Sequence, residues 1–346
     1  MNASCFWRAV ALVFFGSFSA EAAEGLRLVL NPYEGTDWAA VTQHKANLHT
    51  HTLLSGGKLF PDQVYSEYAR RGYTILVLTE HDFCGHALTQ GLDPMKKFGL
   101  FTVNGQEYSK GPHVSGFFLD YDTETRDTDP LVGEIAARGG LAVLNHPERY
   151  WNPGPGGEVP AETRDAYVAL LKKHPALLGI EVYNRNEKSQ HDVALWDAVL
   201  GAAMPDRPVW GFANDDTHER KHIGYGWEVF LLRELSEPAL RQAMTRGSFF
   251  FCVRSKAAKG EAESDPPVIL GIAHDAAART LTLSAAADGA VAGDAQYRWI
   301  AEGQTVATGP VLRYSQVQGL KGYVRAEVSG KGGVTFTNPF GFRRAE

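Results

Sequence analysis

The sequence predicts an α/β fold followed by a smaller all-β domain, and three observations support this prediction. Between about residues 44 and 255, short apolar strands alternate with amphipathic helices, which is the pattern of a parallel sheet or barrel of βα units. A polar linker follows at 255–267. Beyond it, strands alternate with glycine turns and show no helical period, which predicts a small β-sandwich of immunoglobulin-like type.

The first residues, 1–22, are expected to be a signal peptide. Arg8 precedes an apolar run at 9–18, and Ala20 and Ala22 flank Glu21 as in a signal-peptidase site. We therefore expect cleavage near Ala22, a mature chain that begins near Ala23, and a periplasmic or secreted protein. The run is too short to remain as a membrane anchor, and a buried N-terminal helix is the alternative interpretation.

The first domain is expected to span 23–255. Its strands are short apolar runs at 46–50, 74–80, 101–107, 141–147, 178–184, 208–215 and 248–253. Its helices have apolar residues at helical spacing, with proline or glycine near several ends, at 61–72, 129–140, 161–173, 191–204 and 236–247.

The second domain is expected to span 256–346. Its strands alternate apolar and polar residues at 268–275, 280–287, 296–309, 311–317, 323–330 and 333–342. No cluster of metal-ligand residues is visible in this part of the sequence. A structural role is therefore expected, with binding of a carbohydrate or a protein partner as the alternative.

Composition limits the class of protein. The net charge is −6, 44% of the residues are hydrophobic, and no run of basic residues occurs, so a nucleic-acid partner is not expected. The mature chain keeps Cys84 and Cys252, which are too few for a disulfide scaffold and are not spaced for zinc. Two buried thiols are expected, and a single bridge between them is the alternative.

Residues of metal-ligand type end six of the predicted strands. They are His49 and His51, then Glu80, His81 and Asp82, then Glu107, then Asn145 and His146, then Glu181 and Asn184, then Asp215, Asp216 and His218. In a barrel of βα units, the carboxyl ends of the strands gather on one face, so these side chains are expected to converge. Core packing does not produce such a pattern, which predicts a metal site.

The mixture of imidazole and carboxylate suits zinc, manganese or iron. Two such ions can hold a hydroxide between them and also bind a substrate oxygen, so the expected reaction is hydrolysis. Asp82 and Asp215 are candidates to orient histidine ligands by accepting the second ring proton. The alternative for both is a solvated turn residue.

The sequence resembles the PHP (polymerase and histidinol phosphatase) metallohydrolases. The matching pieces, which run from residue 48 to 218, are "LHTHT", "LTEHD", "NGQEYS", "GPHVSGFF", "LNHPE", "GIEVYN" and "NDDTH". The resemblance implies a distorted seven-stranded βα barrel with two or three divalent ions. The ligands that it implies are His49, His51, His81, Glu107, His113, His146, Asp216 and His218. A C-terminal β domain in an exported chain is most similar to the branch that includes carbaryl hydrolase.

One position departs from the family pattern. Members usually carry an acidic residue or a histidine in the turn after the first two histidines, whereas Gly56 stands there in this chain. The family's arrangement gives one ion to His49, His51, Glu107 and Asp216, and a second ion to Glu107, His113 and His146. A third ion would have only His81 and His218, so we expect two firmly bound ions and a weak or empty third site.

Basic residues in the loops after the strands suggest the substrate. Lys58, Arg149, Arg185 and Arg220 would attract a phosphate, and ordinary solvated charges are the alternative. The sequence therefore predicts an exported metal-dependent phosphoesterase that acts on a small phosphorylated molecule. An ester, carbamate or amide hydrolase with the same metals is one alternative, and a metal-containing binding protein without turnover is another.

Overall fold

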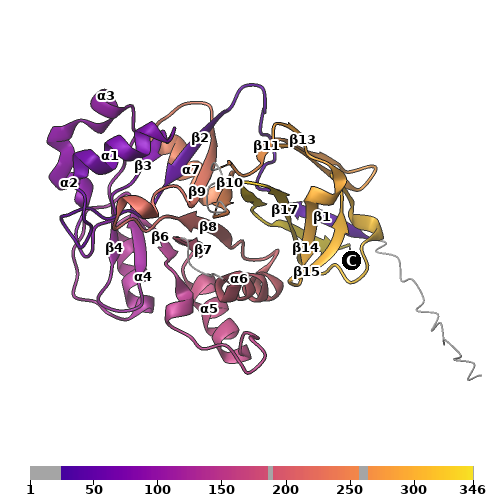
Figure 1. Ribbon diagram of the computed structural model, residues 1–346. Helices are drawn as coiled ribbons and strands as arrows, with labels where there is room; N and C mark the ends of the chain where they lie inside the picture. The colour runs from indigo at the N-terminus through magenta and orange to yellow at the C-terminus, as the bar shows by residue number, and fades with distance from the viewer. Residues whose placement is uncertain (1–24, 186–189, 257–263, 346) are drawn as a thin grey trace, which may run out of the picture.

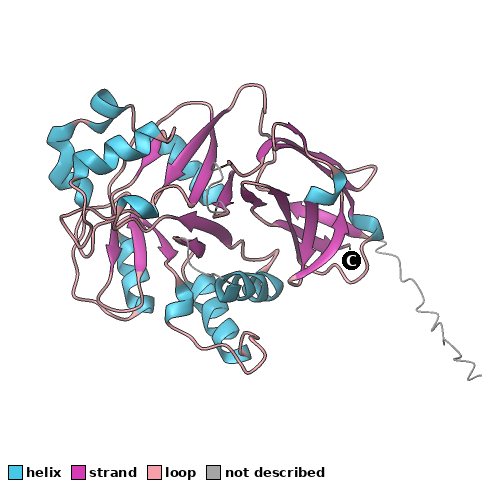
Figure 2. Ribbon diagram, in the orientation of Figure 1, coloured by secondary structure: helices cyan, strands magenta, loops and turns pink. Residues whose placement is uncertain are grey.

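The computed structural model describes residues 25–185, 190–256 and 264–345 (Figure 1). The predicted signal peptide and part of the predicted linker lie outside these residues. Figure 2 shows helices gathered around the strands of the N-terminal part, and a C-terminal part built mainly of strands. The mixed α/β character that the sequence predicts is therefore confirmed. No helix within the described ranges combines the length and the apolar character needed to cross a bilayer.

One sheet carries much of the candidate site. Its five strands, in order, are β4 (Gly105–Tyr108), β5 (Val114–Phe117), β6 (Leu141–Leu144), β7 (Leu177–Asn184) and β8 (Trp210–Asn214). The pairs β4/β5 and β5/β6 are antiparallel, and β6, β7 and β8 are parallel. Nearly every residue of these strands is buried, and the burial includes polar residues such as Gln106 and Glu107 of β4 and Glu181 of β7.

A ten-stranded sheet joins the two parts of the chain. Its path is β1-β19-β17-β18-β10-β9-β2-β3, with β14 paired to β17 and β15 to β14. The strands are β1 (Leu26–Leu30), β2 (Thr42–Asn47), β3 (Ile75–Leu76), β9 (Gly226–Leu232), β10 (Phe249–Arg254), β14 (Tyr297–Ala301), β15 (Gln304–Thr308), β17 (Tyr323–Gly330), β18 (Gly333–Thr337) and β19 (Phe340–Arg344). Because β10 pairs with β18 and β1 pairs with β19, the two predicted domains share one sheet.

A smaller sheet completes the C-terminal part. It consists of β11 (Val268–Asp275), β12 (Thr280–Ala287), β13 (Ala290–Val291) and β16 (Val311–Arg313). Leu281 and Leu283 of this sheet share one buried apolar cluster with Trp299 and Val324 of the larger sheet. The strands of the C-terminal part therefore lie in two sheets that pack through a common apolar layer.

The five predicted helices are confirmed. They are α1 (Pro61–Arg70), α4 (Thr128–Ala137), α5 (Ala161–Lys173), α6 (Gln190–Ala203) and α7 (Glu237–Arg246). Local sequence sets their ends: the Ser236 hydroxyl accepts a hydrogen bond from the Ala239 backbone at the start of α7, and Gly247, with φ of 71°, ends it.

Several elements are not predicted by the sequence. Helices α2 (Gly85–Thr89) and α3 (Pro94–Phe98) are too short to show a helical period. Strand β9 is buried along its whole length although it contains Glu228, which accepts a hydrogen bond from the Ala213 backbone at 3.0 Å. The hairpin of β4 and β5 also replaces the single strand expected at 101–107.

The two large sheets meet around the candidate site. Isolated bridges link Thr50 to Thr217 and His81 to Glu107, which joins the ends of β2 and β3 to the ends of β8 and β4. A buried apolar cluster fills the space between the sheets; it includes Leu48, Val77, Phe117, Phe212 and Phe230. The loops that follow the strands are therefore fixed on a packed core.

The two cysteines of the described chain do not pair. Cys84 and Cys252 are both free and buried. Burial raises the pKa of Cys252 to about 12, so its thiolate is scarcely populated at neutral pH. Of the two expectations, buried thiols and a bridge, the structure agrees with the first.

Candidate metal centre

The eight residues that the resemblance implies as ligands lie together at the ends of the strands. His49 and His51 follow β2, His81 follows β3, Glu107 lies in β4, His113 precedes β5, His146 follows β6, and Asp216 and His218 follow β8. Five of them are buried, whereas His81, His113 and His218 are partly exposed. The centre is thus enclosed on most sides and open to solvent on the side of these three histidines.

Glu107 lies in the middle of the centre. Histidine nitrogens lie within 3.3 Å of both of its carboxylate oxygens: Oε1 is 3.1 Å from His49 Nε2, 2.9 Å from His113 Nδ1 and 3.2 Å from His146 Nε2, and Oε2 is 3.3 Å from His51 Nε2 and 3.0 Å from His81 Nδ1. The side chain is 1% exposed. A carboxylate in this position can contact two cations at once, one through each oxygen.

Asp216 supplies a second carboxylate to the centre. Its Oδ1 lies 3.5 Å from His49 Nε2 and 3.1 Å from His51 Nε2. The residue itself has φ of 43°, a left-handed conformation that follows β8 directly and aims the side chain inward. His49, His51 and Asp216 therefore form a compact group of two imidazoles and one carboxylate.

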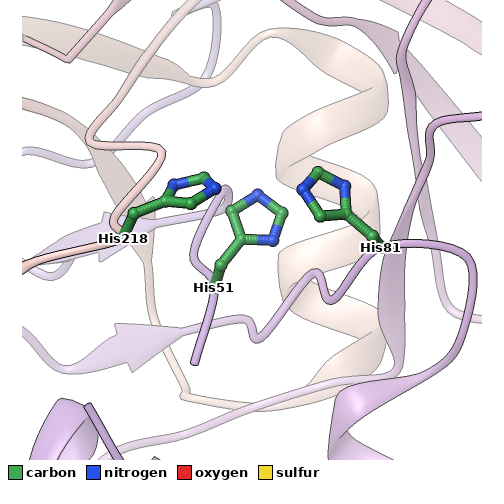
Figure 3. A group of neighbouring side chains, drawn as sticks. All are labelled: His51, His81 and His218. Carbon is green, nitrogen blue, oxygen red and sulfur yellow. The ribbon is translucent and has the colours of Figure 1, made fainter. Parts of the chain in front are cut away.

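A third group consists of histidines alone. Figure 3 shows His51 between His81 and His218, with the three rings close together. The ring centroids of His51 are 4.2 Å from His81 and 4.5 Å from His218. A Cβ atom at Gly56 would lie 3.9 to 4.0 Å from ring atoms of His218 and His81. Position 56 therefore faces this group, and His51 joins the two histidines that the sequence assigns to it.

Several ligand atoms are buried without a hydrogen-bond partner among the described residues. They are His49 Nε2, both ring nitrogens of His51, His81 Nδ1, His146 Nδ1 and Asp216 Oδ1. Some approach a carboxylate, but without the geometry of a hydrogen bond. Buried polar atoms are almost always paired, so a set of orphaned nitrogen and oxygen atoms gathered around two buried carboxylates fits a group of divalent cations.

The charges in the centre favour the same conclusion. Burial acts against protonation of His49, but the carboxylates around it, above all Glu107, raise the pKa of His49 well above its usual value. Burial also raises the pKa of Glu107, but the imidazoles, above all His49, outweigh it and hold that pKa well below its usual value. By contrast, burial lowers the pKa of His218 to about 4, which keeps this imidazole neutral and able to donate its lone pair at neutral pH.

Glu181 and Asn145 orient the ligands. Glu181 Oε1 lies 3.0 Å from His49 Nδ1, and its Oε2 accepts hydrogen bonds from the backbone of His146 and from the Asn184 amide. The Asn145 amide donates to Glu107 Oε1 at 2.8 Å. The sequence gives neither residue this role, although both end predicted strands, and that position is the signal that could have identified them.

Asp82 and Asp215 do not orient a ligand histidine in the part of the chain that the structure describes. Asp82 accepts hydrogen bonds from the backbone and the hydroxyl of Ser109, both at 2.8 Å. Asp215 accepts from the Tyr68 hydroxyl at 3.0 Å and from the backbone N–H groups of 224–226 at 2.7 to 3.0 Å. The expected role is therefore corrected: both carboxylates fix the loops that carry the ligands, because backbone and hydroxyl donors reach them first.

Two of the four cationic candidates lie at the centre. Arg185 Nη2 is 2.8 Å from Asp216 Oδ2, and its Nε donates to the Asp216 carbonyl at 3.0 Å. Arg149 Nη2 lies 3.8 Å from the same carboxylate oxygen. These two guanidinium groups therefore lie beside Asp216, a candidate ligand.

The other two cationic candidates form surface ion pairs. Lys58 Nζ lies 2.8 Å from Glu219, and Arg220 Nη2 lies 3.3 Å from Glu67. The side chains of Lys58 and Arg220 are 69% and 62% exposed. Glu67 is buried and Glu219 is partly exposed, and neither is a candidate ligand, so the structure pairs both cations with other carboxylates instead of bringing them to the ligands.

No family model and no curated protein matches the chain. The chain is similar to a solved two-domain protein from Bacteroides vulgatus that contains a predicted PHP-like metal-dependent phosphoesterase, with 17% sequence identity, a TM-score of 0.48, and coverage of 90% of this chain and 98% of that one. It is also similar to an amidohydrolase from Chromobacterium violaceum with bound sulfate and no metal, with 17% sequence identity, a TM-score of 0.40, and coverage of 58% of this chain and 96% of that one. A proposed metal-dependent phosphoesterase from Bifidobacterium adolescentis is a further similar structure, with 14% sequence identity, a TM-score of 0.39, and coverage of 58% of this chain and 96% of that one. The PHP-type fold and the likeness to carbaryl hydrolase stay predictions.

Proposed function

We propose that this protein is a metal-dependent hydrolase of the PHP type and that its substrate is a phosphoester. The observation that carries the proposal is the position of Glu107, a buried carboxylate with imidazole nitrogens against both oxygens. The orphaned nitrogen and oxygen atoms around it supply further ligand positions. This donor set fits divalent zinc, manganese or iron.

Two ligand sets share Glu107. The resemblance assigns His49, His51, Glu107 and Asp216 to the first and Glu107, His113 and His146 to the second. In the structure, the ligand atom of Glu107 also lies with those of His49 and His146, and with those of His81 and His113. When bound, divalent ions activate a water molecule and stabilise negative charge that develops on a substrate oxygen. A third ion among His51, His81 and His218 would have no acidic ligand of its own, because Gly56 occupies the position that faces two of these rings and Glu107 is shared by the other two sets. We infer that this third ion is weakly bound.

The remaining side chains orient the ligands and the substrate. Glu181 fixes the ring of His49, and Asn145 fixes the carboxylate of Glu107. Arg149 and Arg185, which lie beside Asp216, would bind the non-reacting phosphate oxygens. Their positive charge favours a phosphoester over a neutral ester as the substrate.

We also infer a distorted seven-stranded barrel, a C-terminal sandwich and export. The bridges between the ends of β2 and β8, and of β3 and β4, support the barrel. The apolar layer that the two C-terminal sheets share supports the sandwich. The basic residue, apolar run and small residues at 8–22 support a signal peptide and a periplasmic or secreted location.

One assay separates the proposed reaction from its alternatives. The mature protein is loaded with zinc, manganese or iron and assayed against a phosphomonoester, a phosphodiester and an aryl ester, while its metal content is measured. We expect turnover of a phosphoester together with bound metal. Turnover of the aryl ester alone would identify a carbonyl hydrolase, and bound metal without turnover of any substrate would identify a binding protein.

A further inference from the structure

A cavity of about 240 Å³ opens beside the metal centre. One wall is formed by α5, through Ala166, Tyr167 and Leu170. Leu144 at the end of β6 and Tyr150 in the loop after it form the opposite wall. We call this cavity the leaving-group pocket.

The chemistry of the leaving-group pocket is apolar and aromatic. None of the described residues that line it is an aspartate, glutamate, lysine or arginine. Its polar groups are the hydroxyls of threonine and tyrosine, together with His113 and Asn145 on the side of the metal centre. A sugar or a second phosphate would find few partners there, because buried hydroxyl and phosphate groups need hydrogen bonds or opposite charges.

The leaving-group pocket borders the candidate metal centre through two of its lining residues, His113 and Asn145. His113, which lines the pocket, lies 2.9 Å from Glu107 through its Nδ1. Asn145, also in the lining, donates to the same Glu107 oxygen. The ring of Tyr150 is 5.9 Å from that of His113 and 6.0 Å from that of His146. A group attached to a phosphate at the centre can therefore extend past His113 into the pocket.

The cationic groups lie at a different place in the centre. Arg149 and Arg185 approach Asp216, and neither belongs to the lining of the pocket. The site thus offers positive charge beside Asp216 and apolar surface beside His113. A substrate that matches both has an anionic head and an apolar tail.

We propose that the leaving-group pocket binds an aromatic or similarly apolar group of the substrate, so that the protein hydrolyses phosphate monoesters of apolar alcohols. This inference rests on the proposed phosphoesterase function. In the reaction, water adds to phosphorus, the bond between phosphorus and the ester oxygen breaks, and that oxygen takes up a proton, so the products are inorganic phosphate and the alcohol. An apolar cavity of about 150 Å³ holds one benzene ring, so the pocket has room for more than one ring.

Paired substrates and a matched pair of variants test the proposal. Phenyl phosphate and 2-naphthyl phosphate have similar leaving groups and differ in apolar size. We expect the wild-type protein, loaded with metal, to show a kcat/KM about tenfold higher for the naphthyl ester. Ala166→Phe places a ring in the pocket and should lower this ratio about tenfold. Ala169 lies nearly one turn further along α5 and does not line the pocket, so Ala169→Phe should leave the ratio as in the wild-type protein.

Binding of 2-naphthol, measured by calorimetry on the metal-loaded wild-type protein and both variants, separates this inference from the proposed function. Turnover of neither phosphate ester, with 2-naphthol binding that Ala166→Phe alone weakens, would support the pocket and reject the phosphoesterase reaction. Equal kcat/KM values for the two esters, or a ratio that Ala166→Phe and Ala169→Phe change alike, would overturn the pocket. Failure of 2-naphthol to bind the wild-type protein would overturn it as well.

Discussion

Two regions of the molecule bury several charged side chains, and they differ in whether those charges are satisfied. The contact between α6 and the C-terminal strands contains Arg325, Asp197 and Glu327. Arg325 donates to both oxygens of Asp197 at 2.8 Å and to Glu327 at 2.6 Å, and the Tyr323 hydroxyl also donates to Asp197. In the metal centre, by contrast, nitrogens of four imidazoles and a carboxylate oxygen lack such partners.

The difference lies in the donors. A guanidinium presents five N–H groups in a fixed fork, so one arginine can satisfy two carboxylates and the Arg325 cluster needs no added group. A neutral imidazole has one N–H donor and one lone pair, and a carboxylate has only lone pairs, so this group has more lone pairs than donors, and bound cations would satisfy the excess. The satisfied cluster therefore acts as a structural contact between the two parts of the chain, whereas the unsatisfied one is suited to bind metal.

The change with the largest expected effect removes a candidate ligand from the metal centre. Glu107→Ala removes the carboxylate that two ions would share, and we expect at least about a hundredfold loss of turnover together with loss of bound metal. The C-terminal strands should remain folded, because Glu107 makes no contact with the Arg325 cluster in the contacts described. Steady-state kinetics and metal analysis check the result; activity within about tenfold of wild type contradicts a shared ligand.

The second change removes the central cation of the Arg325 cluster. Arg325→Met leaves Asp197 buried without its cation and leaves Glu327 with Arg298 alone, and this should lower the free energy of unfolding by about 3–5 kcal/mol. Metal content should not change. Arg298→Met is the matched control, because Arg298 pairs with the same Glu327 but is 49% exposed, and it should cost at most about 1 kcal/mol. Equal losses of unfolding free energy in the two variants, measured by urea unfolding, would show that the buried cluster contributes no more to stability than the exposed ion pair.

Glu181→Gln tests whether a hydrogen bond to a ligand matters as much as the ligand itself. The amide keeps the shape of the side chain but weakens the hold on His49 Nδ1, so metal affinity should fall about 10- to 100-fold. Asp82→Asn serves as the comparison, since Asp82 bonds Ser109 and no ligand ring. Competition with a chelating dye measures both, and a larger loss in Asp82→Asn would restore the role that the sequence suggested.

Asp192 is a buried carboxyl group outside the set of candidate ligands, and its pKa is raised by burial. Burial, and then the charge of Glu148, raises the pKa of Asp192 from 3.8 to about 9. The folded protein therefore holds a proton that the unfolded chain releases, so this group's contribution to stability is full below about pH 4 and is lost as the pH rises toward 9. Asp192→Asn should flatten the fall in unfolding free energy between about pH 5 and 8. An unchanged slope in urea unfolding would mean that Asp192 is ionised in the folded protein.

The smallest expected effect is a gain of metal binding at the group of His51, His81 and His218. Gly56→Asp adds a carboxylate that faces His81 and His218, and the content of a third ion should rise. The φ of 105° at this position strains any other residue, so unfolding free energy should fall by about 1–3 kcal/mol. Gly56→Ala carries the same strain without a ligand, and a third ion that rises equally in both variants would exclude the carboxylate as its cause.

Periodicity in the sequence predicts the long elements of this fold, and position along the strands predicts the site. The five helices have enough turns to show an apolar face, whereas α2 and α3 do not. Residues at strand ends, such as His49, Glu107 and His218, could be expected to converge because neighbouring strands bring their ends together, whereas His113 could be assigned only through the resemblance. The partners of Asp82 and Asp215 could not, because loop backbone that no pattern specifies decides which donors reach them.

Metal content tests the central claim most directly. The mature wild-type protein is loaded with zinc, manganese or iron, dialysed against a mild chelator, and analysed for bound metal per chain. We predict two ions that are retained and a third that is lost, because Glu107, with its imidazole neighbours and Asp216, completes two ligand sets, while Gly56 leaves the third without a carboxylate. Retention of no ion would contradict the reading of the orphaned ligand atoms as a metal centre, and three ions held equally firmly would show that another residue completes the third site.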